Sequence, residues 1–221
     1  MLVIFRWWYF LGIAGIGLTT VGAIETKLAA RAGSSPIAVS LDALERGEAP
    51  DQPYAALGEH VALFNHTVQY GRKGGIDWSC YPVIGKDHAY LKDWRTCLER
   101  YETPADIPAR DVPRLKDVVV FVKSAEWKHQ SVIPSDIRTI DRLEGILFRF
   151  DQLSGPEKDA VRAVAPLRDE ARTFVLEAHR HPWPLWKGVA IGGLGVALIL
   201  QAIRLFRRPR GVAAGAGAGT A

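Results

Sequence analysis

The sequence predicts an α+β protein in which two transmembrane helices flank one extracytoplasmic domain. Two long apolar stretches lie near the ends of the 221-residue chain, and every one of its 24 acidic residues lies between Glu25 and Glu177. Short strand-like and helical patterns follow one another between the two stretches. These observations divide the chain into an N-terminal helix over 1–24, a domain over 25–182, a C-terminal helix over 183–206 and a tail over 207–221.

The first apolar stretch has the length and the flanks of a membrane span. Trp7–Ile24 contains no charged side chain, and a helix that crosses the hydrocarbon needs about 20 mostly apolar residues. Trp7, Trp8 and Tyr9 gather at one end, and such rings favour the headgroup region. A cleaved signal peptide is the alternative, but the preceding basic region is weak and the apolar run exceeds the usual ~7–15 residues.

The second stretch sets the expected orientation in the membrane. It runs from Gly188 to Ile203 after Trp183 and Trp186, and four arginines follow it: Arg204, Arg207, Arg208 and Arg210. Because Lys and Arg accumulate on the cytoplasmic side of membrane spans, we expect both termini in the cytoplasm and the middle domain in the periplasm, with the inner (plasma) membrane between. The tail over 207–221 is basic and then Gly/Ala-rich, a composition typical of disorder.

The charge distribution argues against binding to nucleic acid. The protein has a net charge of +4, but six of its 28 basic residues lie outside 25–182, where no acidic residue occurs. The domain itself therefore carries a small negative charge, whereas nucleic-acid-binding domains present a basic patch on the folded part. Positive flanks fit contact with anionic lipid headgroups, so the lipid bilayer is the expected partner.

Both apolar stretches contain glycines at spacings typical of helix packing. Gly188 and Gly192 form a GxxxG motif, and Gly12 and Gly15 line the first stretch. Such residues let two helix backbones approach closely in the membrane. Two interpretations follow: the two spans pack on each other, or they dock onto another membrane subunit.

The middle domain is expected to hold a mostly antiparallel sheet or small barrel with a few short helices. Alternation and apolar runs predict strands, and helical spacing or capping residues predict helices. The expected strands are 37–39, 61–70, 79–84, 118–122 and 143–150; the expected helices are a short one after Ser40, 88–101 and 156–165; and 172–179 is either. Residues 102–116 contain three prolines and are expected to form a surface loop.

Cys80 and Cys97 are the two cysteines of the chain, and both lie in the middle domain. On an oxidising side of the membrane such a pair favours one disulfide. The alternative is a pair of buried free thiols. The spacing fits neither a CxxC redox site nor, without further cysteines, a zinc site.

Motifs that carry chemistry are scarce. The sequence contains no nucleophile elbow, Walker A loop, dinucleotide fingerprint or HExxH motif. Glu177, His179 and His181 alternate, and an extended backbone would place all three on one face as possible metal ligands. They equally fit solvated residues just outside the second span. Aromatic residues between 77 and 101, with Asp77, Asp87 and His88 nearby, could line a ligand pocket or build the core.

The absence of such motifs favours a membrane-anchored, non-enzymatic subunit or assembly factor without a cofactor, whose domain binds a membrane protein or larger complex. The order of span, domain and span is similar to that of the surfeit-locus family of cytochrome oxidase assembly proteins, but their tryptophan–glutamine motif after the first span is not found here. The alternatives are an extracytoplasmic ligand-binding or sensing module and a membrane-bound metal-dependent hydrolase.

Overall fold

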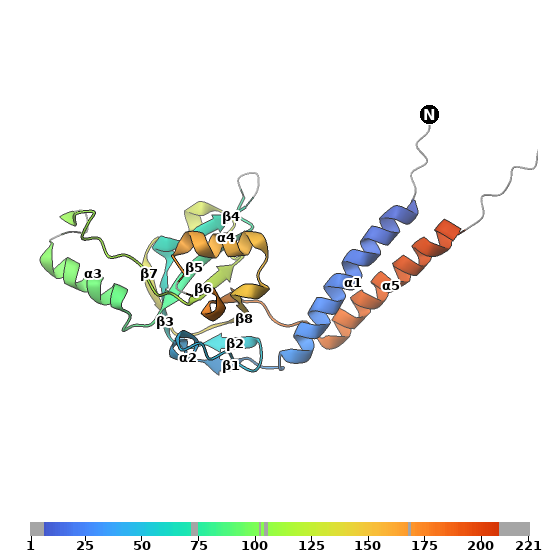
Figure 1. Ribbon diagram of the computed structural model, residues 1–221, viewed down its shortest axis with the longest axis horizontal. Helices are drawn as coiled ribbons and strands as arrows, with labels where there is room; N and C mark the ends of the chain where they lie inside the picture. The colour runs from blue at the N-terminus through green and yellow to red at the C-terminus, as the bar shows by residue number, and fades with distance from the viewer. Residues whose placement is uncertain (1–6, 72–74, 102, 104–105, 168, 208–221) are drawn as a thin grey trace, which may run out of the picture. The chain divides into compact units, whose positions relative to one another are not determined.

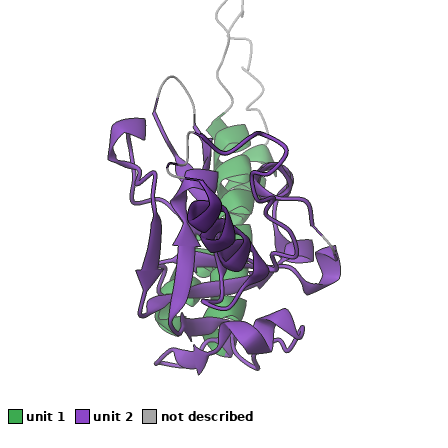
Figure 2. Ribbon diagram, turned by 90° about the vertical axis from the view of Figure 1, so that its left-hand side faces the viewer, with its two compact units in different colours: residues 1–30, 183–221 green, residues 31–182 purple. Residues whose placement is uncertain are grey.

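In the computed structural model the chain forms two units (Figures 1 and 2). Residues 7–71, 75–101, 103, 106–167 and 169–207 are described. One unit joins the two ends of the chain, up to Ala30 and from Trp183, and the other comprises Arg31–Pro182. Two of the arginines behind the expected orientation, Arg208 and Arg210, lie outside the described residues together with the Gly/Ala-rich tail.

The first unit is a pair of long helices, α1 (Trp7–Arg31) and α5 (Leu185–Arg207). Both are long and apolar enough to cross a membrane, and only 11% of the apolar window of each is buried. The sequence placed the end of the first helix at Ile24, but the helix continues to Arg31. The added turns consist mainly of good helix formers, and the next helix-breaking residue is Gly33.

Glycines bring α1 and α5 into backbone contact. A Cβ atom added at Gly22 would lie 2.4 Å from the backbone nitrogen of Gly192, and one added at Gly195 would lie 2.5 Å from that of Thr19. Gly15 and Gly188 are similarly tight against the facing helix, with 2.8 Å to the Gly195 carbonyl and 2.9 Å to the Thr26 nitrogen. No side chain larger than hydrogen fits at these positions without moving a helix.

The glycines singled out from the sequence divide into two groups. Gly15 and Gly188 lie at the tight contacts, whereas Cβ atoms added at Gly12 and Gly192 would meet only ordinary contacts at 3.9 and 3.8 Å. Gly22 and Gly195, which lie outside the GxxxG motif, are among the tightest. The packing of the two helices on each other is therefore the arrangement that these glycines form in the structure.

The second unit contains a curled, half-barrel sheet of nine strands. Eight strands follow the order β1-β2-β8-β9-β6-β5-β3-β7, and β4 pairs with β5 off this path. Six of the strand pairs are antiparallel, and β1–β2 and β6–β9 are parallel. The strands are β1 (Ile37–Val39), β2 (Tyr54–Leu57), β3 (His60–Leu63), β4 (Val68–Tyr70), β5 (Trp78–Ile84), β6 (Val120–Ser124), β7 (Ile137–Ile140), β8 (Leu143–Arg149) and β9 (Phe174–Ala178).

A hydrophobic core covers each face of the sheet. Side chains of a strand alternate between the faces, so Val120 and Val122 enter one core while Phe121 enters the other. The first core includes Leu41 and Leu44 of α2 (Leu41–Glu45), which Ser40 caps through a hydrogen bond from Ala43 N. This double cover explains why the central strands are continuous apolar runs.

The second core packs against two helices. α4 (Gly155–Val164) buries Ala160, Val161 and Val164 there, and a capping box between Ser154 and Glu157 begins the helix. α3 (Ala89–Arg100) buries Tyr90 and packs Leu91 and Trp94 against the same core, while its second half projects from the sheet (Figure 1). Short 3-10 turns complete the unit: η1 (Phe64–His66), η3 (Gln130–Val132), η4 (Phe150–Gln152) and η5 (Glu170–Arg172).

The structure differs from the expected strands in three places. The strand expected over 61–70 is interrupted by η1, where Thr67 donates hydrogen bonds through its backbone and side chain to the Phe64 carbonyl and turns the chain. β2 and β7 were not expected. The segment over 172–179, left as a strand or a helix, contains β9.

Candidate functional site

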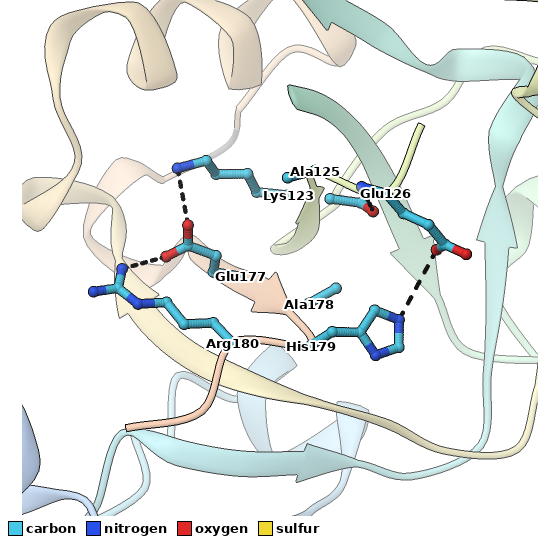
Figure 3. Close-up of a pocket in the computed structure, with 8 residues that line it drawn as sticks. Lys123, Ala125, Glu126, Glu177, Ala178, His179 and Arg180 are labelled. Carbon is cyan, nitrogen blue, oxygen red and sulfur yellow. Dashed lines mark hydrogen bonds and ion pairs between the residues drawn. The ribbon is translucent and has the colours of Figure 1, made fainter. Parts of the chain in front are cut away.

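A cavity of 580 Å³ lies where the parallel strands β6 and β9 both end (Figure 3). Its lining is Lys123, Ser124, Ala125 and Glu126 from the end of β6 and Glu177, Ala178, His179 and Arg180 from the end of β9. Lys123 and Glu177 are direct partners in the register, so their side chains leave the sheet on the same face. That face is also the one covered by α4.

The half-buried charges of this cavity are paired with one another. Lys123 Nζ lies 2.5 Å from Glu157 Oε1 and 3.2 Å from Glu177 Oε1, and Arg180 Nη1 lies 2.5 Å from Glu177 Oε2. Burial alone would lower the pKa of Lys123, but hydrogen bonds and charge attraction from the two carboxylates raise that pKa above its usual value. Burial would raise the pKa of Glu157, yet the Lys123 ammonium and Ser154 bring that pKa below its usual value.

This network has a structural role that its geometry explains. Glu157 lies in the first turn of α4, whereas Lys123 and Glu177 lie on the sheet, so the ion pairs fasten the start of α4 to β6 and β9. At the mouth of the cavity His179 Nε2 and Glu126 Oε2 are 4.0 Å apart, and both side chains are more than 60% exposed. Such an exposed pair interacts weakly in water.

The predicted metal ligands Glu177, His179 and His181 do not converge in the structure. β9 ends at Ala178, and His179 has a left-handed φ of 59°, so the alternation that would align the three side chains is broken. Glu177 is engaged by Lys123 and Arg180, while the Nδ1 atom of His181 lies 2.7 Å from the Tyr54 hydroxyl. Across the described ranges no group of three His, Cys, Asp or Glu side chains is arranged to hold a metal.

The predicted disulfide between Cys80 and Cys97 is not present, and both cysteines are free. Cys80 is buried on β5 in the second core, where burial raises the pKa of its thiol to about 12. Cys97 is on the projecting half of α3, and its thiol donates a hydrogen bond to the Asp111 carbonyl at 3.3 Å. The two thiols are separated because Cys97 lies in the second half of α3, which projects from the sheet (Figure 1).

The aromatic residues between 77 and 101 do not line a common pocket. Tyr81 enters the first core beside Phe64 and Trp127, and Trp78 stacks on Tyr70 at 5.0 Å between ring centroids. Tyr90 and Trp94 pack on the opposite face of the sheet, where the Tyr90 hydroxyl lies 2.8 Å from His66 Nε2. The nearby His88 caps α3 by accepting from Tyr90 N. The core interpretation therefore accounts for these side chains.

A second cavity, of 560 Å³, lies beside His88 and is lined mainly by residues with ionisable side chains. Its lining is Glu45, His88, Asp117, Val119, Asp169 and Arg172. Burial, with a smaller contribution from Asp42, raises the pKa of Glu45, and burial lowers the pKa of His88 despite the nearby Asp117 and Asp93. Asp169 is engaged in capping Ala171 N and lies 3.5 Å from Arg172, so part of this charge is already used within the fold.

An apolar groove of 470 Å³ lies between α3 and the edge of the sheet at β7. One face of α3 lines it with residues spaced i, i+3, i+4, i+7 and i+8: Leu91, Trp94, Arg95, Leu98 and Glu99. Val61, Ile137 and Thr139 line the opposite wall from β3 and β7. Leu98 and Ile137 are 49% and 41% exposed, so the groove presents apolar side chains to solvent. We call this surface the α3–β7 groove.

The α3 wall of this groove can be predicted from the sequence, whereas the β7 wall was not. The helix expected over 88–101 has Leu91, Trp94 and Leu98 at helical spacing, which predicts an apolar stripe without saying what covers it. Ile137 and Thr139 lie in a four-residue strand with the sequence IRTI, whose three β-branched residues are the signal that could have revealed β7. No protein-family model, curated protein or solved structure matches the chain.

Proposed function

We propose that the protein is a non-enzymatic, membrane-anchored subunit or assembly factor whose α+β domain binds a partner protein through the α3–β7 groove. The anchor is the pair α1 and α5, whose outward faces expose large apolar side chains such as Ile13, Ile16, Leu194 and Leu200. Lipid is the solvent that suits such faces. The glycine contacts explain how the two helices stay together in a medium that provides no hydrophobic drive for association.

The proposed orientation places both termini in the cytoplasm and the domain outside it. Arg204 and Arg207 end α5, and the two further arginines follow in the sequence. A periplasm-dependent reporter enzyme fused after Gly155 is expected to be active, and the same reporter fused after Arg210 is expected to be silent. A reporter that works only in the cytoplasm should give the opposite pattern. Activity after Arg210 and silence after Gly155 would reverse the orientation.

The observation that supports partner binding is the α3–β7 groove. The charges that line the cavity at the ends of β6 and β9 are largely paired within the fold, whereas the groove holds exposed leucine and isoleucine side chains that gain free energy when covered. Side-chain patches of this kind on a folded domain mark interaction surfaces. The absence of converging catalytic groups in the described cavities leaves binding as the activity that the geometry supports best.

Substitution of Leu98 by glutamate tests this proposal. The change places a charge in the groove, and we expect any partner that co-purifies in mild detergent to fall at least tenfold while the protein remains folded. Val132→Glu is the matched control because Val132 is 56% exposed but does not line the groove. Quantitative mass spectrometry of the purified complexes compares the two variants. Equal partner recovery in both variants would contradict the proposed function.

A further inference from the structure

The edge of the sheet beside the groove is unpaired on its outer side. β7 is the last strand of the sheet order, and within the described part of the chain its partner is β3 alone. The other terminal strand, β1, has three residues, and so has β4. β7 has four, all at least partly exposed. An open edge is a template for another strand, and proteins usually protect it with charges, prolines or bulges.

The register of β7 shows which of its backbone groups point outward. Phe64 N donates to the Asp136 carbonyl at 3.2 Å, so Asp136 faces β3. In an antiparallel pair this inward direction recurs at every second residue, so Arg138 and Ile140 also face β3. The N–H and C=O groups of Ile137 and Thr139 therefore point away from the sheet. They form two donors and two acceptors at the spacing of a ladder.

The same two residues line the α3–β7 groove with their side chains. Their side chains share a face with Val61 and Leu63, their register partners, which is the face that α3 overlies. Arg95 and Glu99 project from α3 into the groove, and neither has an ion-pair partner among the described residues. The groove thus offers an unpaired backbone ladder, apolar contacts and one free charge of each sign side by side.

We propose that the partner adds an extended segment of its own chain to β7 as a further antiparallel or parallel strand beneath α3. This inference rests on the proposed function and specifies how the groove is used. The segment would carry apolar side chains at alternate positions, toward Leu98 and Trp94, with an acidic side chain near Arg95 and a basic one near Glu99. Main-chain hydrogen bonds supply affinity in this mode of recognition, and alternate side chains supply specificity.

Two other occupants fit the observations less well. A helix satisfies its own backbone, so it would leave the outward groups of Ile137 and Thr139 without protein partners. A second copy pairing through β7 would be related by a two-fold axis and would place its own α3 on the same face of the joined sheet, beside the first. A single extended segment brings no helix with it.

A pair of proline substitutions separates backbone pairing from side-chain contact. Thr139→Pro removes an outward N–H to which no described residue is bonded, so we expect an unchanged melting temperature and at least a tenfold loss of the co-purifying partner. Thr139→Ala keeps the N–H and should retain the partner within about twofold. Arg138→Pro removes an inward N–H and should lower the melting temperature. This result would check that the backbone of Arg138 faces β3 and that of Thr139 faces outward.

Photo-crosslinking identifies the occupant in native membranes. A photoreactive residue at Ile137 or Leu98 of the full chain should label one segment of the partner. The residues labelled in that segment should be every second residue, as expected for a strand. Crosslinks to the same chain in another copy, to positions spaced as on a helix, or no crosslinks above a Val132 control would each overturn strand addition. If Leu98→Glu loses the partner and Thr139→Pro does not, strand addition fails while the proposed function stands.

Discussion

Replacing Gly22 with leucine is expected to separate α1 from α5. Even a Cβ atom at this position would lie 2.4–2.6 Å from the backbone nitrogen and Cα of Gly192, a distance that real Cβ atoms do not adopt. Because the obstacle is backbone and not a flexible side chain, the helices can relieve the contact only by moving apart. Their association would then lose the close backbone packing that the glycines allow.

An engineered disulfide measures this separation. The Cβ position of Gly12 is 3.9 Å from Ala202 Cβ, within the range of a disulfide, so Gly12→Cys with Ala202→Cys should crosslink in a Cys97→Ser background. Gly22→Leu should lower the crosslink yield at least tenfold. Gly17→Leu is the matched control, since a Cβ there meets nothing within 4 Å. Equal yields in the two variants would show that the glycine contacts do not hold the helices together.

Replacing Val122 with aspartate is expected to prevent the domain from folding. Val122 is fully buried in β6, between β5 and β9, and its side chain lies in the first core. An unpaired carboxylate there costs several kcal/mol, against a total stability of about 5–15 kcal/mol for a typical domain. The neighbouring Val119 is a weaker site for this test because it is only partly buried.

Protease resistance and near-ultraviolet circular dichroism of the full chain in detergent report the outcome. The Val122→Asp protein should be cleaved throughout Arg31–Pro182 and should lose its tertiary signal, while α1 and α5 remain helical. Val132→Asp places the same charge at a 56% exposed valine and should behave as the unchanged protein. A resistant Val122→Asp domain would mean that β6 is not at the centre of the core.

The parts of the fold that the sequence predicted are those governed by local patterns. Apolar length identified α1 and α5, Ser40 identified the start of α2, and the valine run identified β6. The parts that it missed depend on distant partners. β2 and β7 are short, and their strand character comes from pairing with β8 and β3, far along the chain.

At the candidate site, too, local features could be predicted from the sequence and features that depend on distant segments could not. An apolar stripe on α3 could be read from spacing, but its groove needs β7, whose position no local pattern gives. The metal and disulfide hypotheses each assumed a geometry that the fold does not adopt. His179 turns the chain out of the extended conformation, and Cys97 lies on a helix that leaves the sheet. Among the helix glycines, spacing alone did not separate Gly22 from Gly12.

The place of β9 in the sheet has a consequence for biogenesis. β1, β2 and β8 form one half of the strand order and β6, β5, β3 and β7 the other, and β9 is the strand that joins them. β9 is also the last strand to be synthesised, and α5 begins seven residues after it ends. The two half-sheets must therefore keep open inner edges until β9 has been synthesised, and such edges are prone to aggregation. Closure of the sheet and synthesis of the second apolar helix therefore follow one another within a few residues of nascent chain.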